Sequence, residues 1–391
     1  MLLVLIGKTM TTNCITRIFE TDGKRVVSNL EGNNMMTGII SVLVKNCSLF
    51  GKIKADYLVL ETDESYVPVV YQDLRLDCLV VLNFFRDQLD RLGEVESLIL
   101  KINEFLKTYD KNLILNSDDP NVSRLGMANP DNRNIYYYSV NRYKHATDKF
   151  KEAGEGKFCP FCNNRLEYLY YQYAHVGKFV CPECGFGKNE IFNLIDNVDL
   201  DSRCFEIDSI KYLTNFNSIY STYNFAAATS VAKLYGIKIM SIRDALERFV
   251  LNNGRLEKMI VDGNDTIINI AKNPTGANVS LRLVNEDLEH KEVLFVLNDN
   301  VADGRDVSWI WDINFSDIKN VDRIITSGTR AFDLAVRVKT SGFMVNRIEA
   351  CPDVYEAIER LYENSGKKYV ITNYTAIQPT RERLMRYCEK R

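Results

Sequence analysis

The sequence contains no apolar run that approaches the roughly 20 residues needed to cross a membrane. Residues 1–6 are apolar, but they lack the basic segment and the small-residue cleavage site of a secretory signal peptide. Net charge is also nearly absent: 49 Lys and Arg oppose 52 Asp and Glu, so electrostatics indicates no nucleic acid partner. Because ten cysteines occur without an export signal, we expect a cytoplasmic protein in which paired cysteines are more often metal ligands than disulfides.

Internal repeats, low-complexity stretches and long linkers are also absent from the sequence. Its 391 residues exceed the size of one ordinary hydrophobic core and predict two or three domains. Hydrophobic residues make up 46% and charged residues 26%, which is typical of a globular protein. We place a boundary near residues 236–241, with a first domain over residues 1–236 and a second over residues 237–391.

The clearest motif is a set of two Cys-x-x-Cys pairs separated by 18 residues. Four thiolates at this spacing can form a closed tetrahedral shell, so we predict one structural zinc ion bound by Cys159, Cys162, Cys181 and Cys184. A redox role needs only one such pair, and isolated buried cysteines do not explain two spaced pairs. We expect a zinc-ribbon insertion over residues 155–190, with a hairpin at residues 166–174 and a left-handed turn at Gly185.

The first domain has the rhythm of a parallel sheet. Apolar runs at residues 55–62, 78–84 and 112–116 alternate with helical patterns such as residues 94–108. Open parallel sheets bind ligands at the carboxyl ends of their strands, and polar clusters follow these runs at residues 61–64, 83–87 and 116–119. Any one cluster can simply cap the next helix. Three at successive strand ends favour a magnesium–nucleotide site.

A partial P-loop occurs at the start of the chain. Residues 2–6 predict a buried strand, and Gly7-Lys8-Thr9 follows directly. In a P-loop, backbone N–H groups face the phosphates, the Lys contacts the β and γ oxygens, and the Thr contacts magnesium. Val-Leu-Ile at residues 4–6 replaces the glycine-rich residues that normally precede Gly-Lys-Thr. Gly-Lys-Thr after a strand also arises by chance, so the motif alone leaves both readings open.

Several stretches together resemble the Mur ligase family, and more closely its MurT-type branch. They are SNLEGNNM at residues 28–35, LETDES at 60–65, NFFRDQLDR at 83–91, LNSDDP at 115–120, the four-Cys insert, AKNP at 271–274 and LNDNVADGRDVSW at 297–309. The resemblance covers nearly the whole chain. The last segment, combined with a zinc ribbon inside a Mur-like central domain, is highly specific.

The resemblance implies an α/β fold: a Mur ligase-like central parallel-sheet ATPase domain with a Cys₄ zinc-ribbon insertion, followed by a smaller α/β C-terminal domain. It implies ATP-dependent amidation of the D-glutamate α-carboxylate in the lipid II stem peptide to D-isoglutamine, through an acyl phosphate. Ammonia would come from a separate class I glutaminase subunit of the GatD type. Contact with the membrane would be peripheral, through lipid II.

The matching motifs also imply residue roles. Asp306 would be the acidic residue that this chain lends to the Cys–His pair of the partner, where it orients the His as a triad acid does. This suits a chain with only three histidines, none beside a plausible nucleophile. The ATP and Mg²⁺ ligands would be Gly7, Lys8 and Thr9 at the phosphates and magnesium, Glu61 at magnesium, and Asn116 and Asp119 near the adenine or ribose.

The sequence departs from the family at one place. MurT-like proteins have Gly-Thr-Asn before Gly-Lys-Thr, and a Thr where Met10 stands here. This departure favours an alternative, a degenerate, non-catalytic Mur ligase-like scaffold for the glutaminase partner, whereas Glu61, Asp87 and Asp306 favour the ligase. A folylpolyglutamate synthase is a third alternative, and the zinc ribbon argues against it.

Overall fold

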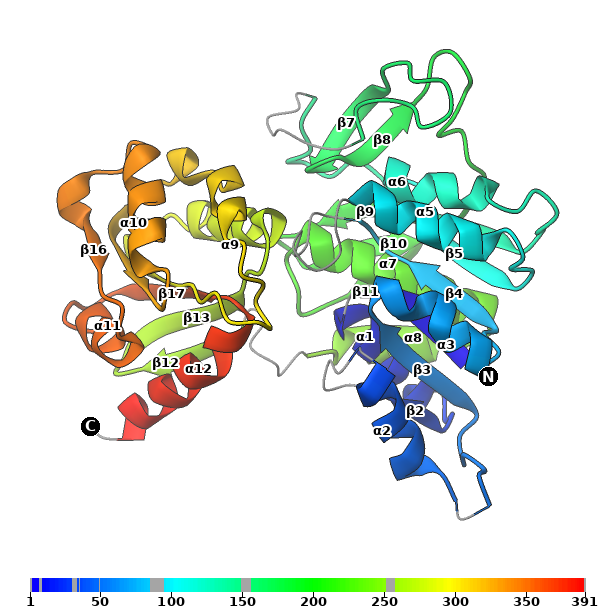
Figure 1. Ribbon diagram of the computed structural model, residues 1–391, viewed down its shortest axis with the longest axis horizontal. Helices are drawn as coiled ribbons and strands as arrows, with labels where there is room; N and C mark the ends of the chain where they lie inside the picture. The colour runs from blue at the N-terminus through cyan, green and yellow to red at the C-terminus, as the bar shows by residue number, and fades with distance from the viewer. Residues whose placement is uncertain are drawn as a thin grey trace. The chain divides into compact units, whose positions relative to one another are not determined.

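The computed structural model describes residues 2–6, 9–29, 34, 36–48, 50–84, 95–148, 156–250 and 257–389. These residues form two compact units, one ending at Val250 and one within residues 257–389 (Figure 1). Each unit contains a mostly parallel sheet covered by helices, so the expected α/β fold class is confirmed. Among the described residues, no helix is both long enough and apolar enough to span a membrane.

The first unit is built on a nine-stranded sheet. Parallel strands follow one another in the order β2-β3-β1-β4-β5-β6-β9, and β10 and β11 extend the sheet as antiparallel strands beyond β9. The strands are β1 (Leu2–Ile6), β2 (Val26–Ser28), β3 (Tyr57–Thr62), β4 (Cys78–Val81), β5 (Asn112–Asn116), β6 (Ile135–Val140), β9 (Ile191–Asp199), β10 (Cys204–Ile207) and β11 (Ile210–Leu213).

Helices cover both faces of this sheet, as parallel strands buried on both sides require. They are α1 (Thr9–Thr21), α2 (Met36–Asn46), α3 (Val67–Asp73), α5 (Val95–Leu106), the short α6 (Pro120–Ser123), α7 (Ile219–Leu234) and α8 (Ile239–Glu247). The chain leaves β1 toward β2 on one side and leaves β4 toward β5 on the other. The topological switch point therefore lies at the carboxyl ends of β1 and β4, where ligands of such sheets bind.

A hairpin of β7 (Glu167–Tyr173) and β8 (Val176–Val180) stands apart from the main sheet (Figure 1). It belongs to the segment between β6 and β9, yet those two strands pair directly with each other in parallel. The insertion therefore replaces a crossover connection and leaves the sheet continuous.

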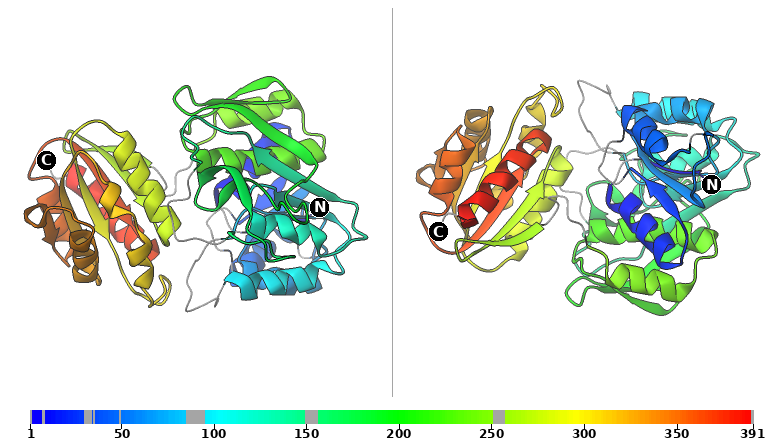
Figure 2. Two further views of the ribbon diagram at one scale, coloured as in Figure 1. Left: turned by 90° about the horizontal axis from the view of Figure 1, so that it is seen from above. Right: turned by 90° about the horizontal axis from the view of Figure 1, so that it is seen from below.

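The second unit contains a six-stranded sheet in the order β12-β13-β17-β14-β15-β16, parallel except for β12. One face packs against α9 and α10, and the other against α11 and α12, which is red in Figure 2. The elements are β12 (Glu257–Val261), β13 (Asn264–Ile270), α9 (Pro274–Glu286), β14 (Lys291–Val296), β15 (Val321–Ser327), α10 (Ala331–Thr340), β16 (Ile348–Ala350), α11 (Val354–Leu361), β17 (Lys367–Thr372) and α12 (Tyr374–Glu389).

The first unit ends at Val250 rather than at Gly236, where the sequence suggested a boundary. Gly236 has φ +66° and ends α7, but α8 continues the same unit. In α8, Ile242 and Leu246 are buried, and the hydroxyl of Ser241 donates to Asp22 at 2.8 Å. Gly236 therefore marks a turn between α7 and α8 inside the first unit, not the boundary between the two units.

Candidate functional site

The two Cys-x-x-Cys turns have the same backbone shape. In each, the N–H of the first cysteine donates to the carbonyl oxygen five residues later, at 2.7 Å from Cys159 and 2.8 Å from Cys181. The residue four positions after each first cysteine donates back at 3.0 Å and has a positive φ, 59° at Asn163 and 75° at Gly185. The left-handed turn expected at Gly185 is present, and Asn163 is its counterpart in the first pair.

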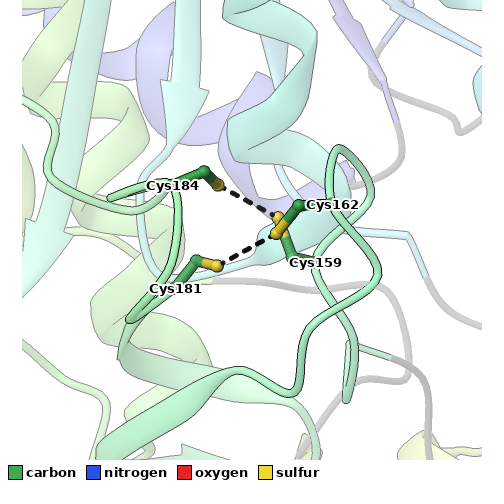
Figure 3. A group of neighbouring side chains, drawn as sticks. All are labelled: Cys159, Cys162, Cys181 and Cys184. Carbon is green, nitrogen blue, oxygen red and sulfur yellow. Dashed lines mark hydrogen bonds between the residues drawn. The ribbon is translucent and has the colours of Figure 1, made fainter.

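The four cysteine sulfurs face one another from these two turns (Figure 3). All four Sγ atoms lie within 4.8 Å of one another, with Cys159–Cys184 at 3.5 Å and Cys162–Cys181 at 3.4 Å. A tetrahedral ion with metal–sulfur bonds of about 2.3 Å would separate its ligand atoms by about 3.8 Å, so the cluster has the size that Zn²⁺ needs. The cluster is confirmed, and the identity of its metal stays a prediction.

The four thiols of the cluster differ in acidity. The pKa of the Cys181 thiol is lowered to about 7, mainly because the backbone N–H of Cys184 donates to its sulfur. Burial raises the pKa of the Cys159 thiol, and the pKa values of the Cys162 and Cys184 thiols are also raised. Leu166, Phe179 and Phe186 pack beside the buried cysteines. Since four thiolates fill a tetrahedron, a bound zinc ion would have a structural role.

The predicted nucleotide site lies at the carboxyl edge of the first sheet. Gly7 and Lys8 lie outside the described residues, while Thr9 is half-buried at the first position of α1. Glu61 is buried near the end of β3, where its backbone is held by the Asn29 side chain: Asn29 accepts from the Glu61 N–H and donates to the Glu61 carbonyl, both at 2.8 Å. The strand end that carries Glu61 is therefore fixed.

A buried hydroxyl at the same edge supports a ligand there. Thr62 pairs in register with Ile6, the last residue of β1, so it adjoins the point where the partial P-loop begins. Within the part of the chain that the structure describes, the buried Thr62 Oγ1 has no hydrogen-bond partner. Buried polar atoms are nearly always hydrogen-bonded, so the Thr62 hydroxyl is available to hydrogen-bond a ligand at this edge.

Asn116 and Asp119 have clear roles within the fold. The Asn116 amide donates to the Leu82 carbonyl at 3.1 Å, which ties the end of β5 to the end of β4. The Asp119 carboxylate caps α6 by accepting from the N–H of Asn121 at 2.9 Å, and it also accepts from the N–H of Phe84 at 3.2 Å. Both side chains are fully buried, so their contact with a nucleotide stays a prediction.

Two further buried side chains at this loop, Asp118 and His175, were not assigned individual roles from the sequence. Asp118 accepts from the Tyr223 hydroxyl at 2.7 Å and from the Ser139 hydroxyl at 2.7 Å. Burial raises the pKa of Asp118, and these hydrogen bonds oppose the rise. His175, in the turn between β7 and β8, places Nε2 at 3.3 Å from Asp119 Oδ1. An Asp-Asp pair after an apolar strand was visible in the sequence, but its partners are distant in the chain.

The segment between β6 and β9, which includes the hairpin, is fastened to this loop at three points. Besides the His175–Asp119 contact, the N–H of Gly177 donates to the Asp118 carbonyl at 2.8 Å. The amide of Asn189 donates to Ser117 Oγ at 3.0 Å, and it also reaches Ser123 Oγ. The cysteine-bearing segment is thus anchored on the loop that follows β5.

We expect His175→Ala to destabilise the first unit by ~1–3 kcal/mol, because it removes a neighbour from a fully buried carboxylate. The free energy of unfolding from urea denaturation is the measurement. His145→Ala is the matched control, since His145 is exposed and its loss should change stability by less than about 0.5 kcal/mol. Equal effects of the two substitutions would contradict the structural role of His175.

Asp306 lies in the loop after β14, at an edge where functional loops gather. The loop is held in place by Asp303, which accepts from the Thr375 N–H at 2.8 Å. Asp306 itself is exposed, and Ser308 donates its backbone N–H to Asp306 Oδ1 at 2.7 Å. This hydrogen bond lowers the pKa of Asp306, so the side chain is a carboxylate at neutral pH.

A pocket of about 500 Å³ adjoins Asp306. Its apolar lining includes Trp311, Phe332 and Val336, each at least half exposed. Arg330 also lines the pocket, and its guanidinium forms an ion pair with Asp299 at 3.2 Å. We define these three apolar side chains as the Asp306 patch. Trp311 is exposed, whereas Trp309, two residues earlier, packs on the core of the unit.

Comparisons with known proteins agree with this architecture. The Mur ligase middle domain matches residues 6–180, and the MurT ligase C-terminal model matches residues 270–377. Among solved structures, a pseudomurein peptide ligase type C from Methanothermus fervidus has a TM-score of 0.74 at 20% identity, covering 98% of this chain and 78% of that chain. At this identity, the likeness concerns the fold alone.

Curated relatives match over nearly the full length. The lipid II isoglutaminyl synthase (glutamine-hydrolyzing) subunit MurT of Staphylococcus aureus (strain COL) is 34% identical over 387 residues, which are 98% of this chain and 86% of the relative. The subunit of the same name from Streptococcus pneumoniae (strain ATCC BAA-255 / R6) is 28% identical over 386 residues, covering 97% and 85%. By this extent of similarity, the chain belongs to the MurT-type branch of the Mur ligase family.

Proposed function

We propose that this chain is the ATP-dependent synthetase subunit of a lipid II isoglutaminyl synthase. ATP phosphorylates the α-carboxylate of D-glutamate in the lipid II stem peptide, giving an acyl phosphate and ADP. Ammonia then attacks the acyl carbon, phosphate leaves, and D-isoglutamine forms. The observation that supports the ligase reading best is the buried Glu61 side chain near the carboxyl end of β3, beside the end of β1.

The residues at this edge suggest how the site would work. Glu61 and Thr9 would hold Mg²⁺ and Lys8 would contact the phosphates, with Asn116 and Asp119 shaping the loop beside them. Mg²⁺–ATP supplies the phosphoryl group when bound. The two hydrogen bonds from the Asn29 side chain hold the Glu61 backbone in place. The Glu61 carboxylate would therefore need little reorganisation on binding a metal ion.

Ammonia would come from a class I glutaminase subunit bound at the Asp306 patch. That subunit would contribute a Cys–His pair, and Asp306 would accept a hydrogen bond from its imidazole. The lowered pKa of Asp306 supports this role, because a triad acid must remain ionised to stabilise the imidazolium. Exposed aromatic side chains around a carboxylate are typical anchors of a protein interface.

The function is tested by reconstituting the chain with its glutaminase, lipid II, Mg²⁺–ATP and glutamine. Mass spectrometry of the stem peptide should show replacement of one carboxyl group by an amide. Omission of ATP should prevent this change, and ammonium salts should replace glutamine. Glu61→Gln should remove amidation while the complex with the glutaminase remains, and an amide formed at the wild-type rate would exclude Glu61 from the site.

The partial P-loop supports the second candidate, a non-catalytic scaffold, and nucleotide binding separates the two. Residues 4–6 pair with β3 as part of β1, so Gly-Thr-Asn must be inserted between Ile6 and Gly7 rather than substituted. We expect weak ATP binding by the unmodified chain. The insertion should strengthen it by at least about tenfold, because each added hydrogen bond to a charged group contributes ~1.5–3 kcal/mol.

Isothermal titration calorimetry measures both forms, with an Ala-Ala-Ala insertion at the same place as the control. Tight binding by the unmodified chain would show that Val-Leu-Ile does not impair the loop. No binding by either form, together with no amidation, would favour the scaffold.

A further inference from the structure

Helix α2 and the turn after it lie at the edge of the first unit near strand β2, the last strand of the sheet (Figure 1). Ile40 and Val44, one helical turn apart, are 50% and 68% exposed, and Phe50 is 90% exposed. Large apolar side chains this open to water occur singly on most proteins, but neighbouring ones usually mark a binding surface. We call α2 together with residues 47, 48 and 50–54 of the following turn the α2 tip.

The turn that carries Phe50 is held by several hydrogen bonds. Cys47 and Ile53 form an antiparallel bridge, and Ser48 accepts from the N–H of Gly51 and donates its N–H to Lys52, both at 2.9 Å. Gly51 has a φ of +74°, a conformation that glycine adopts without strain. The described part of the turn therefore presents Phe50 on an ordered frame.

The α2 tip is basic in a chain that is acidic overall. Residues 36–54 contain Lys45, Lys52 and Lys54 and no Asp or Glu, although the chain as a whole has a net charge of −3. All three lysines are exposed. The tip would therefore be attracted to an anionic surface.

We propose that the α2 tip docks the protein onto a bilayer that contains anionic lipids, with Phe50 and Val44 among the headgroups and the lysines at the lipid phosphates. Apolar side chains flanked by lysines are typical of interfacial membrane segments. Lysine is depleted at protein–protein interfaces, which argues against a protein partner here. The role of this docking in lipid II amidation rests on the proposed function. Binding to the bilayer is measured in the absence of lipid II.

The position of α2 gives the docking a purpose. The helix begins just after the segment that follows the carboxyl end of β2, on the edge where the nucleotide is expected. Its 11 residues correspond to about 16 Å of helix between that edge and the tip. Because α2 connects the parallel strands β2 and β3, its tip lies toward their amino ends, so a tip resting on the bilayer would leave the carboxyl edge open to ligands.

Flotation with vesicles tests the proposal. The full chain should float with vesicles of phosphatidylglycerol and phosphatidylcholine, should bind vesicles of phosphatidylcholine alone far less, and should be released by salt. Lys52→Glu with Lys54→Glu should weaken binding by at least about 25-fold, since each lysine near an anionic surface contributes about fivefold. Phe50→Asp should weaken it by about tenfold or more.

Matched controls carry the same changes elsewhere. Lys101→Glu with Lys211→Glu alters two exposed lysines of the same unit, and Leu288→Asp alters an apolar side chain that is similarly exposed. Both controls should float like the unmodified chain. Phe50→Trp should keep binding and shift its fluorescence to shorter wavelength on the anionic vesicles.

Two results would overturn the proposal: no flotation with anionic vesicles, or equal flotation of the tip variants and the controls. Loss of the glutaminase complex in the tip variants with unchanged flotation would also overturn it and assign the surface to a protein. The tip variants should keep full amidation of lipid II in detergent and lose it on vesicles. Flotation without amidation by the unmodified chain would refute the proposed function and leave the docking supported.

Discussion

Asp306→Asn should lower glutamine hydrolysis by the complex with the glutaminase by roughly 10³- to 10⁴-fold, as loss of a triad acid does elsewhere. The amide keeps the shape of the side chain, so the two subunits should still co-purify. The loss arises because an amide neither fixes the imidazole tautomer nor stabilises its charged form. Glutaminase activity of the co-purified complex is the measurement, and amidation from added ammonium should persist.

Asp312→Asn is the matched control, because Asp312 is an exposed carboxylate of the same loop region that does not line the pocket. It should leave glutamine hydrolysis unchanged. If Asp306→Asn behaves like Asp312→Asn, Asp306 has no part in the partner's chemistry and only stabilises the turn at Ser308.

Cys162→Ser should abolish metal binding and unfold the hairpin segment. Purified protein should contain about one Zn²⁺ per chain, and structural zinc sites contribute about 10–16 kcal/mol to the folding of small zinc domains. A serine replaces a thiolate with a poor zinc ligand, so the remaining three sulfurs cannot close the shell. Metal analysis and hydrogen exchange across residues 156–190 are the measurements.

Cys47→Ser is the control, because Cys47 is exposed and lies outside the cluster. It should keep the zinc and the protection of residues 156–190. Fresh protein purified without chelators that contains no zinc would refute the metal assignment, whatever the behaviour of the variants.

The features that depend on local sequence were predictable. The Cys-x-x-Cys turns are set by residues a few positions apart, and their spacing sufficed to predict a cluster that the structure brings together. The carboxyl end of β3 followed from an apolar run that stops at polar residues, so the position of Glu61 near that strand end was predictable, and its contact with Mg²⁺ stays a prediction. Asn163 was missed, because asparagine adopts a positive φ less regularly than glycine does.

Contacts between distant residues were not predictable in the same way. Tyr223 reaches Asp118 across 105 positions, and His175 reaches Asp119 only because the hairpin folds back onto the loop after β5. Nothing in the spacing of these residues distinguishes them from core tyrosines or surface histidines. The assignment of α8 to the first unit likewise depends on its packing against that unit and on the Ser241–Asp22 hydrogen bond, not on the composition around Gly236.

The direct pairing of β6 with β9 has a consequence for the order in which the chain folds. These neighbouring strands are separated by about 50 residues of intervening sequence, so joining them means closing a long loop with a matching loss of chain entropy. A metal that ties the two cysteine pairs together would gather about half of that loop into one local unit first. Metal binding would thus reduce the effective length of the loop that must close before β9 pairs with β6. The rate of this folding step would therefore depend on metal binding.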